Sequence, residues 1–189
     1  MFDNRRHLIQ IACRLFADRG YDAVGVQELV TQAGVTKPTL YHYFGSKQGI
    51  LEAVLADYFE PFYKILLSHS VYQGDLVFSL EIITNDYLIF ASTEPVFFRL
   101  WMTMRFAPVE SIAYQCFSPY LNQQQTLIRN LFIKAAEQHG NMRNRQDSYT
   151  ITFLGMIFTY ASLALQDSST MDDSLVYRAV HQFMYGIFS

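Results

Sequence analysis

The sequence predicts an all-α fold of about nine helices. Apolar residues recur at three- and four-residue spacing along most of the chain, which is the period of an amphipathic helix. No run alternates apolar and polar residues as a half-buried strand does, and no internal repeat is present. With 189 residues, 51% of them apolar, the chain can form an N-terminal domain of three short helices and a larger helical bundle. We expect these two domains to span residues 1–46 and 47–189.

Four helices are expected in the N-terminal third of the chain. The first spans residues 3–19 and the second residues 26–33, and a glycine follows each of them. Thr36 suits the N-cap of a third helix, because its hydroxyl can accept a hydrogen bond from an early backbone N–H. That helix ends near Phe44, and Ser46 then caps a long fourth helix that joins the two domains.

The second and third helices, with the tight turn between them, have the dimensions of a helix-turn-helix. Gly34 supplies a positive φ in the turn. On the third helix, Leu40 and Phe44 are four residues apart and can face the first two helices. The polar and aromatic residues between them are then exposed. A recognition helix needs this arrangement, because a few apolar residues anchor it while others offer hydrogen-bond donors to the major groove.

A longer series of residues surrounds this motif. Residues 16–21 read Phe-Ala-Asp-Arg-Gly-Tyr, residues 33–35 read Ala-Gly-Val, residues 40–44 read Leu-Tyr-His-Tyr-Phe, and Lys47 follows. With these residues, the segment 8–55 resembles the N-terminal domain of TetR-family transcriptional regulators. The resemblance covers about a quarter of the chain. It implies a regulator, usually a repressor, that binds a pseudo-palindromic double-stranded DNA operator as a homodimer and is released by a small-molecule effector.

The resemblance also implies which residues face DNA. The DNA-binding set comprises Thr36, Lys37, Pro38, Thr39, Tyr41, His42, Tyr43 and Lys47. Lys47 is expected to contact phosphate, because it adds charge beside the backbone donors that begin the fourth helix. Tyr43 could instead belong to the core, and His42 could be an ordinary surface histidine. Two departures from the family pattern, Gly25 and Gly49, are expected to weaken a helix cap and a first helical turn.

Residues 58–120 contain fifteen aromatic residues, about a quarter of the segment. A filled core explains any single ring, but their number and the accompanying Met and Arg residues favour an adaptable apolar pocket. In the TetR family this region holds the effector, so we expect a small hydrophobic or aromatic molecule here. Arg99 or Arg105 could bind an acidic group, with surface ion pairing as the alternative. The predicted ligand-binding set is Phe62, Tyr87, Phe90, Phe98, Arg99, Trp101, Met102, Arg105, Tyr114 and Phe117.

The last two helices, near residues 147–166 and 172–188, carry more apolar surface than the core of one chain can cover. A two-fold dimer that buries both helices in a four-helix bundle accounts for this surface. The resemblance implies the same, since the family dimerises through its last helices. The predicted interface residues are Phe153, Met156, Tyr160, Val176, Val180, Phe183 and Met184.

Signatures of other classes of protein are missing from the sequence. Its five histidines include no pair four residues apart, and it has no Gly-x-Ser-x-Gly elbow and no Gly-rich phosphate loop. We therefore expect no enzymatic activity, no metal site and no cofactor. The strongest alternative function is a helical DNA-binding adaptor that binds a protein partner and senses no small molecule.

Charge and hydropathy carry weaker signals. The net charge is −3, yet residues 1–50 hold six Lys and Arg against four Asp and Glu, so the N-terminal part is mildly basic. No charged-then-apolar leader opens the chain. The richest apolar run, residues 153–165, falls short of the ~20 residues that a bilayer requires. We expect a soluble cytoplasmic protein with no membrane partner.

Overall fold

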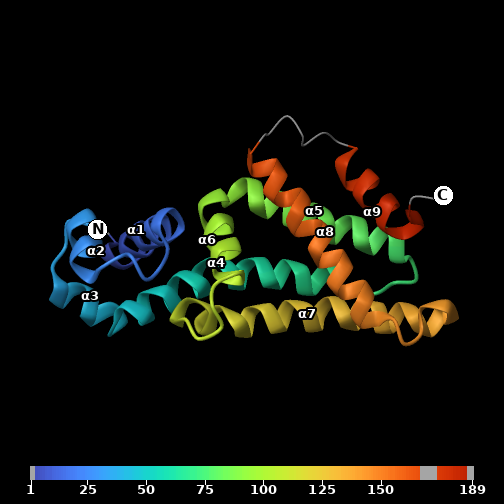
Figure 1. Cartoon of the computed structure of the whole chain (residues 1–189), viewed down its shortest axis with the longest axis horizontal. Helices are drawn as coiled ribbons and strands as arrows, with labels where there is room; N and C mark the ends of the chain where they lie inside the picture. The colour runs from blue at the N-terminus through green and yellow to red at the C-terminus, as the bar shows by residue number, and fades with distance from the viewer. Residues whose placement is uncertain (1–2, 167–173, 187–189) are drawn as a thin grey trace. The chain divides into compact units, whose positions relative to one another are not determined.

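The computed structural model describes residues 3–166 and 174–186, and all regular secondary structure in this part of the chain is helical (Figure 1). The predicted all-α class with about nine helices is confirmed. The predicted ends of the last helix, Asp172 and Phe188, lie outside the described residues. In order, the elements are α1 (Asn4–Arg19), α2 (Val26–Gln32), α3 (Lys37–Phe44), α4 (Lys47–His69), α5 (Leu76–Thr93), α6 (Pro95–Arg105), α7 (Ile112–Gln138), the 3-10 turn η1 (Gly140–Met142), α8 (Gln146–Gln166) and α9 (Leu175–Tyr185).

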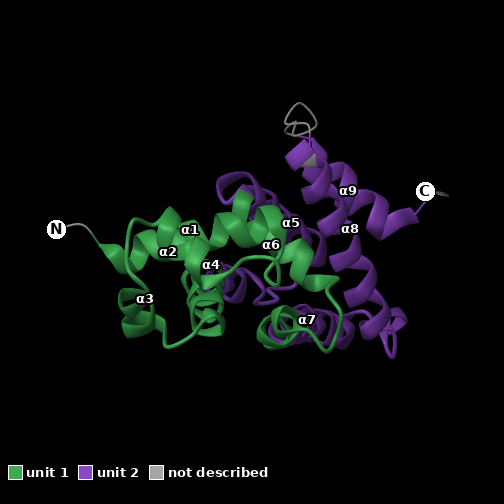
Figure 2. Cartoon of the chain, turned by 60° about the vertical axis from the view of Figure 1, so that its left-hand side comes forward, with its two compact units in different colours: residues 1–61, 96–121 green, residues 62–95, 122–189 purple. Residues whose placement is uncertain are grey.

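The chain forms two compact units, coloured separately in Figure 2. Unit 1 consists of residues 1–61 and 96–121, and unit 2 of residues 62–95 and 122–189. The helices α4 and α7 therefore each contribute residues to both units. The two units are defined by the packing of the chain, whereas the boundary predicted after residue 46 separates the DNA-binding domain from the rest of the chain. That boundary remains a prediction.

Unit 1 contains the three N-terminal helices. The carboxylate of Asp3 caps α1 by accepting hydrogen bonds from the backbone N–H groups of Arg5 and Arg6. The apolar stripe of α1 is buried where α1 meets α2 and α3, and Leu8 and Phe16 are fully inaccessible to solvent. Burying a large apolar side chain contributes roughly 1.5–3 kcal/mol, so this stripe fixes the positions of the short helices that follow.

A second part of unit 1 is a cluster of aromatic rings around Trp101. Phe59 of α4, Phe98 of α6 and Phe117 of α7 place their ring centroids 5.2, 5.9 and 5.7 Å from that of Trp101. All four side chains are buried. Rings at this spacing contribute packing energy beyond the area they bury, so the cluster holds the first part of α4 against α6 and α7.

Unit 2 is built around α5, which packs against α8 and α9. At one place the ring of Phe62 stacks on Phe90 with centroids 4.1 Å apart and meets the edge of Tyr87 at 5.0 Å. At another, Phe132 of α7 lies 6.0 Å from Phe153 of α8. The core of unit 2 is thus as aromatic as that of unit 1.

By length and composition alone, α5 could cross a membrane, with a mean hydropathy of 1.2 over 18 residues. The expectation that no segment approaches this requirement is wrong for α5 by that criterion. Half of the α5 window is buried inside the unit, and its buried positions include the hydroxyl residues Ser79 and Thr84. A central core helix of a globular unit has these same properties.

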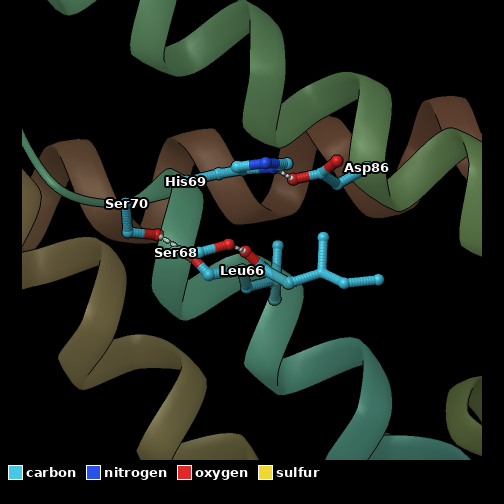
Figure 3. Close-up of polar contacts among 6 residues, drawn as sticks. Leu66, Ser68, His69, Ser70 and Asp86 are labelled. Carbon is cyan, nitrogen blue, oxygen red and sulfur yellow. Dashed lines mark hydrogen bonds and ion pairs between the residues drawn. The ribbon is translucent and has the colours of Figure 1, made fainter.

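The C-terminal end of α4 is joined to α5 by an ion pair within unit 2 (Figure 3). Nδ1 of His69 lies 2.7 Å from Oδ2 of Asp86, whose side chain is 10% exposed. Beside this pair, the Ser70 hydroxyl donates to the carbonyl oxygen of Leu66 at 2.6 Å and satisfies one acceptor at the helix end (Figure 3). Burial raises the pKa of Asp86, and the hydrogen bond and charge of His69 oppose that shift.

Asp86 is expected to lower stability as the pH rises. Because its pKa is higher in the folded than in the unfolded state, the folded state holds the proton more tightly. The free energy of unfolding should therefore fall as the pH increases from the ordinary aspartate range through the raised pKa. Asp86→Asn should remove this slope in denaturant titrations between about pH 3 and pH 7. Asp147→Asn, which removes a carboxylate at an exposed ion pair with Arg129, is the control against which the slope of Asp86→Asn is compared. Equal slopes for wild type and Asp86→Asn would contradict the prediction.

Candidate nucleic-acid interface

The helices α2 and α3 pack against each other across a four-residue turn. Gly34 has φ of +64°, as predicted, and the backbone N–H of Val35 donates to the carbonyl oxygen of Val30 at 3.0 Å. Leu40 of α3 is fully buried, while Phe44 is half-buried under the guanidinium of Arg5, 5.7 Å from the ring centroid. The predicted helix-turn-helix is therefore present, and Leu40 is its main anchor.

The start of α3 differs from the prediction in one respect. Thr36 occupies the N-cap position, but its hydroxyl makes no hydrogen bond to a backbone N–H of α3. It lies instead 2.9 Å from the hydroxyl of Thr39, one turn further along. The prediction of a capping bond from Thr36 is therefore wrong, because its hydroxyl pairs with that of Thr39 instead. This leaves the N–H groups of the first turn without a side-chain cap, as at the ends of helices that bind phosphate.

The outer face of α3 is polar and aromatic. Tyr41 is 47% exposed and Tyr43 41% exposed, so the alternative that Tyr43 belongs to the core is not what the structure shows. The ring of His42 lies 5.3 Å from that of Tyr43. Lys37 and Pro38 are also exposed, and Thr39 is half-buried. The structure thus brings the predicted α3 residues onto one short helix, where their contact with DNA remains a prediction.

Lys47 has a defined partner inside unit 1. Its Nζ lies 4.1 Å from the centroid of the Tyr21 ring, a cation–π contact. Burial lowers the pKa of Lys47, and Asp22 opposes this shift. Burial also raises the pKa of Tyr21 to about 12, with nearby Cys116, Asp22 and Glu52 adding to the shift, so the ring stays a neutral phenol at physiological pH. The contact between Tyr21 and Lys47 was not predicted from the sequence, although Tyr21 belongs to the Gly-Tyr motif.

The junction of α3 and α4 depends on a glycine. The hydroxyl of Ser46 accepts a hydrogen bond from the N–H of Gly49 at 2.9 Å, which confirms the predicted cap of α4. A Cβ at position 49 would lie 1.9 Å from the carbonyl oxygen of Phe44. The expectation that Gly49 merely weakens the first turn of α4 is therefore wrong, since no other residue fits this close approach of two backbones.

The residues predicted to bind an effector are divided between the two units. Phe98, Trp101 and Phe117 belong to the packed aromatic cluster of unit 1, and the exposed Arg99 forms an ion pair with Asp18 at 3.2 Å. The half-buried members Met102, Arg105 and Tyr114 also belong to unit 1, whereas Phe62, Tyr87 and Phe90 pack together in unit 2. The ligand-binding set remains a prediction, and its rings serve as core within each unit.

The residues predicted to form a dimer interface lie on α8 and α9 of unit 2. Two of them, Phe153 and Val180, are fully buried inside the unit, and Phe153 contacts Phe132 and Phe183. The half-buried members are Met156, Tyr160, Val176, Phe183 and Met184. More exposed apolar side chains on the same helices are Ile151, Leu163, Tyr177 and Tyr185, which the predicted interface set does not contain. The helical period identified two apolar faces but not which of them the unit covers itself.

Metal chemistry finds no support in the described residues. Within residues 3–166 and 174–186, no group of three or more His, Cys, Asp or Glu side chains is placed to hold a metal ion. Cys116, half-buried, has its sulfur 3.9 Å from a carboxylate oxygen of Glu52, and burial and that carboxylate raise its pKa. A raised pKa keeps the thiol protonated and poorly nucleophilic.

Comparison with known proteins places the strongest similarity in the N-terminal helices. Residues 8–54 match the family model described as "Bacterial regulatory proteins, tetR family". The chain is 41% identical over 56 residues to the HTH-type transcriptional repressor KstR2 of Mycolicibacterium smegmatis, which covers 30% of this chain and 27% of that protein. It is 45% identical over 53 residues to the transcriptional activator FasR of the same organism, covering 28% and 24%. The similarity thus spans about a quarter of these relatives' length.

Solved structures resemble the chain over most of its length. A TetR-family transcriptional regulator from Bordetella parapertussis superposes with a TM-score of 0.78 at 20% identity, covering 99% of this chain and 97% of that one. FadR from Bacillus subtilis, in complex with stearoyl-CoA, has a TM-score of 0.76 at 16% identity and coverages of 96% and 98%. At these identities the resemblance is one of fold.

Proposed function

The chain belongs to the TetR family through its N-terminal domain, and from this premise we propose that it is a cytoplasmic DNA-binding transcriptional regulator. The observation that carries the proposal is the outer face of α3, where polar and aromatic side chains are exposed on a helix that Leu40 anchors. The start of α4 supports the same function, because Ser46 and Gly49 hold the backbone that carries Lys47 next to α3. Repression is the proposed outcome of binding.

DNA recognition in this proposal uses two copies of α3. A two-fold dimer inserts one α3 into each of two major grooves about 34–36 Å apart, so the operator is pseudo-palindromic. Tyr41, His42 and Lys37 reach base edges and phosphates, while Lys47 binds a phosphate at the start of α4. The phosphate contacts of Lys37 and Lys47 each add a salt-dependent term to the affinity for DNA.

The proposed effector is a small hydrophobic molecule. This is supported by FadR of Bacillus subtilis, which shares the fold and was solved with stearoyl-CoA. Long-chain acyl-CoA is therefore the first class of compound to test. The helix α4 runs from Lys47 in unit 1 to His69 in unit 2, so a ligand that shifts this helix would move the residues beside α3.

Two prolines favour such a movement. Pro61 lies inside α4 where that helix passes from unit 1 to unit 2, and Pro119 lies inside α7 close to the corresponding passage. A proline within a helix removes one backbone hydrogen bond, which makes bending easier at that point.

The homodimer is proposed to form through the exposed faces of α8 and α9. On α8, Ile151 and Leu163 are exposed and lie three turns apart, with the exposed Gly155 and Thr159 between them at four-residue spacing. On α9, three rings follow at the same spacing: His181 lies 5.3 Å from Tyr177 and 4.6 Å from Tyr185. A self-complementary apolar surface of this kind, with a glycine for close approach, suits a two-fold interface.

Leu163→Glu is expected to break this dimer. A carboxylate buried at the two-fold interface has no partner, so the dissociation constant should rise by at least about a hundredfold. The leucine is 48% exposed in the single chain, so the chain itself should keep its fold. Sedimentation equilibrium measures the change. Leu67→Glu, at a similarly exposed residue of α4, is the matched control and should remain dimeric. A dimeric Leu163→Glu protein would place the interface elsewhere.

Selection of bound duplexes from a random pool tests the proposed function. Enrichment of a pseudo-palindromic site is expected, and failure to enrich any sequence would refute DNA-specific regulation.

The enriched duplex is then challenged with palmitoyl-CoA, free palmitate and free coenzyme A. Release by palmitoyl-CoA and palmitate, but not by free coenzyme A, supports a small hydrophobic effector. If no small molecule causes release, the protein is instead an adaptor whose signal comes from a protein partner.

A further inference from the structure

Unit 2 contains a cleft of about 400 Å³ that the proposed regulation does not use. Its walls come from the turn before α5, the C-terminal end of α7, η1, the first turn of α8 and the last turn of α9. None of the ten residues predicted to bind the effector is among the described residues that line it. The cleft is therefore separate from the predicted effector residues, although its lining residues Phe183 and Met184 belong to the predicted dimer interface.

The size and walls of the cleft suit a small ring compound. Binding sites for small molecules are commonly about 300–1,000 Å³, whereas a protein partner requires roughly 800 Å² of surface on each side. Phe132, Tyr149 and Phe183 line the cleft, with the rings of Tyr149 and Phe183 at 5.6 and 6.1 Å from that of Phe132. Met142 and Met184 complete the apolar wall, and their flexible side chains can adjust to a bound ring.

The polar side chains that line the cleft include the carboxylate of Asp75, which is an acceptor, and the amide of Asn141, which can both donate and accept. One oxygen of Asp75 caps α5 by accepting from the N–H of Phe78 at 2.9 Å, which fixes the carboxylate in the lining. The hydroxyl of Tyr72 donates to Oε1 of Gln138 at 3.1 Å and lies 3.2 Å from Nε2 of His139. These contacts help to hold His139 in the lining.

We propose that this cleft binds a small aromatic molecule that carries a hydrogen-bond donor, either a phenol hydroxyl or a benzylic ammonium group. The ring packs among Phe132, Tyr149 and Phe183, and the donor points to Asp75. An aromatic carboxylate is expected to bind more weakly, because its charge would face that of Asp75. The site is independent of the proposed DNA and effector functions.

Titration of the full chain with matched ligands tests the proposal, with the methyl resonances of Met142 and Met184 as local reporters in NMR spectra. The compounds are p-cresol, its methyl ether 4-methylanisole, 4-methylbenzylammonium and 4-methylbenzoate. We expect p-cresol and the ammonium compound to shift both methyl resonances, and the ether and the benzoate to bind at least about tenfold more weakly. Whichever of p-cresol and 4-methylbenzylammonium binds more tightly identifies the donor group that the cleft prefers. The proposal would be refuted if neither p-cresol nor 4-methylbenzylammonium bound more tightly than 4-methylanisole, or if the shifts were confined to Met102 and Met104 of unit 1.

Two variants separate binding from folding. Asp75→Asn keeps a good N-cap but removes the charge, so it should reduce the affinity for p-cresol about tenfold and leave that for 4-methylanisole unchanged. Val77→Trp fills the cleft from the half-buried start of α5 and should abolish binding of both compounds. Glu81→Gln, on the same helix but not in the lining, is the control and should bind like wild type. Unchanged binding by Val77→Trp would show that the compounds bind elsewhere.

Discussion

Gly49→Ala is expected to destabilise unit 1 by about 3 kcal/mol and to abolish operator binding. The new Cβ would lie 1.9 Å from the carbonyl oxygen of Phe44 and 3.1 Å from its carbonyl carbon. That oxygen cannot move away easily, because it also accepts a hydrogen bond from the N–H of Ser46 at 2.8 Å. Relief of the clash must therefore displace the backbone that joins α3 to α4. Urea titration measures the loss of stability, and gel retardation measures the loss of DNA binding.

Gly25→Ala is the matched control for this substitution. Gly25 lies in the same unit, its φ is −92°, and a Cβ there would meet no atom within 4 Å. Alanine is a poorer N-cap than glycine, so a loss below about 1 kcal/mol is expected. If the two alanine variants proved equally stable, the backbones at positions 44 and 49 would not approach each other as closely as the structure shows.

The contrast between these glycines shows what local sequence reveals. The helix-turn-helix could be predicted because its determinants act over a few residues: a glycine with positive φ at Gly34, an anchoring Leu40, and the Ser46 cap of α4. Gly49 looked like a defect in a helix, because the reason for it is a contact with Phe44 that spacing alone does not reveal. Such close approaches appear only once the backbone path is known.

Longer-range features were harder to predict for a related reason. The helical period shows that α8 and α9 each carry two apolar faces, but only packing decides that Phe153 and Val180 face the unit's own core while Tyr177 remains exposed. Likewise, the predicted ligand residues are close in sequence, yet Trp101 and Tyr87 belong to different units. A periodic pattern identifies the face of a helix, and the partner of that face depends on the tertiary fold.

Alanine substitutions on α3 should weaken operator binding in two distinguishable ways. Tyr41 is 47% exposed and offers a hydroxyl and a ring edge, so as a base-reading residue its loss should reduce affinity for the selected operator about 10- to 100-fold. Non-specific DNA should bind nearly as before.

Lys37 is expected to contact phosphate, so Lys37→Ala should weaken binding to all sequences alike and reduce the slope of log K against log salt by about one. Fluorescence anisotropy at several salt concentrations measures both effects.

The control for Tyr41→Ala is Phe78→Ala, which removes a 58% exposed ring from α5 in unit 2. Neither variant should change the free energy of unfolding by more than about 1 kcal/mol, because both side chains are largely solvated in the folded chain. Loss of operator affinity in Tyr41→Ala but not in Phe78→Ala therefore reports contact with DNA rather than loss of fold. Full affinity in both Tyr41→Ala and Lys37→Ala would mean that α3 is not the recognition helix. The anchoring of α3 by Leu40 would then serve only the packing of unit 1.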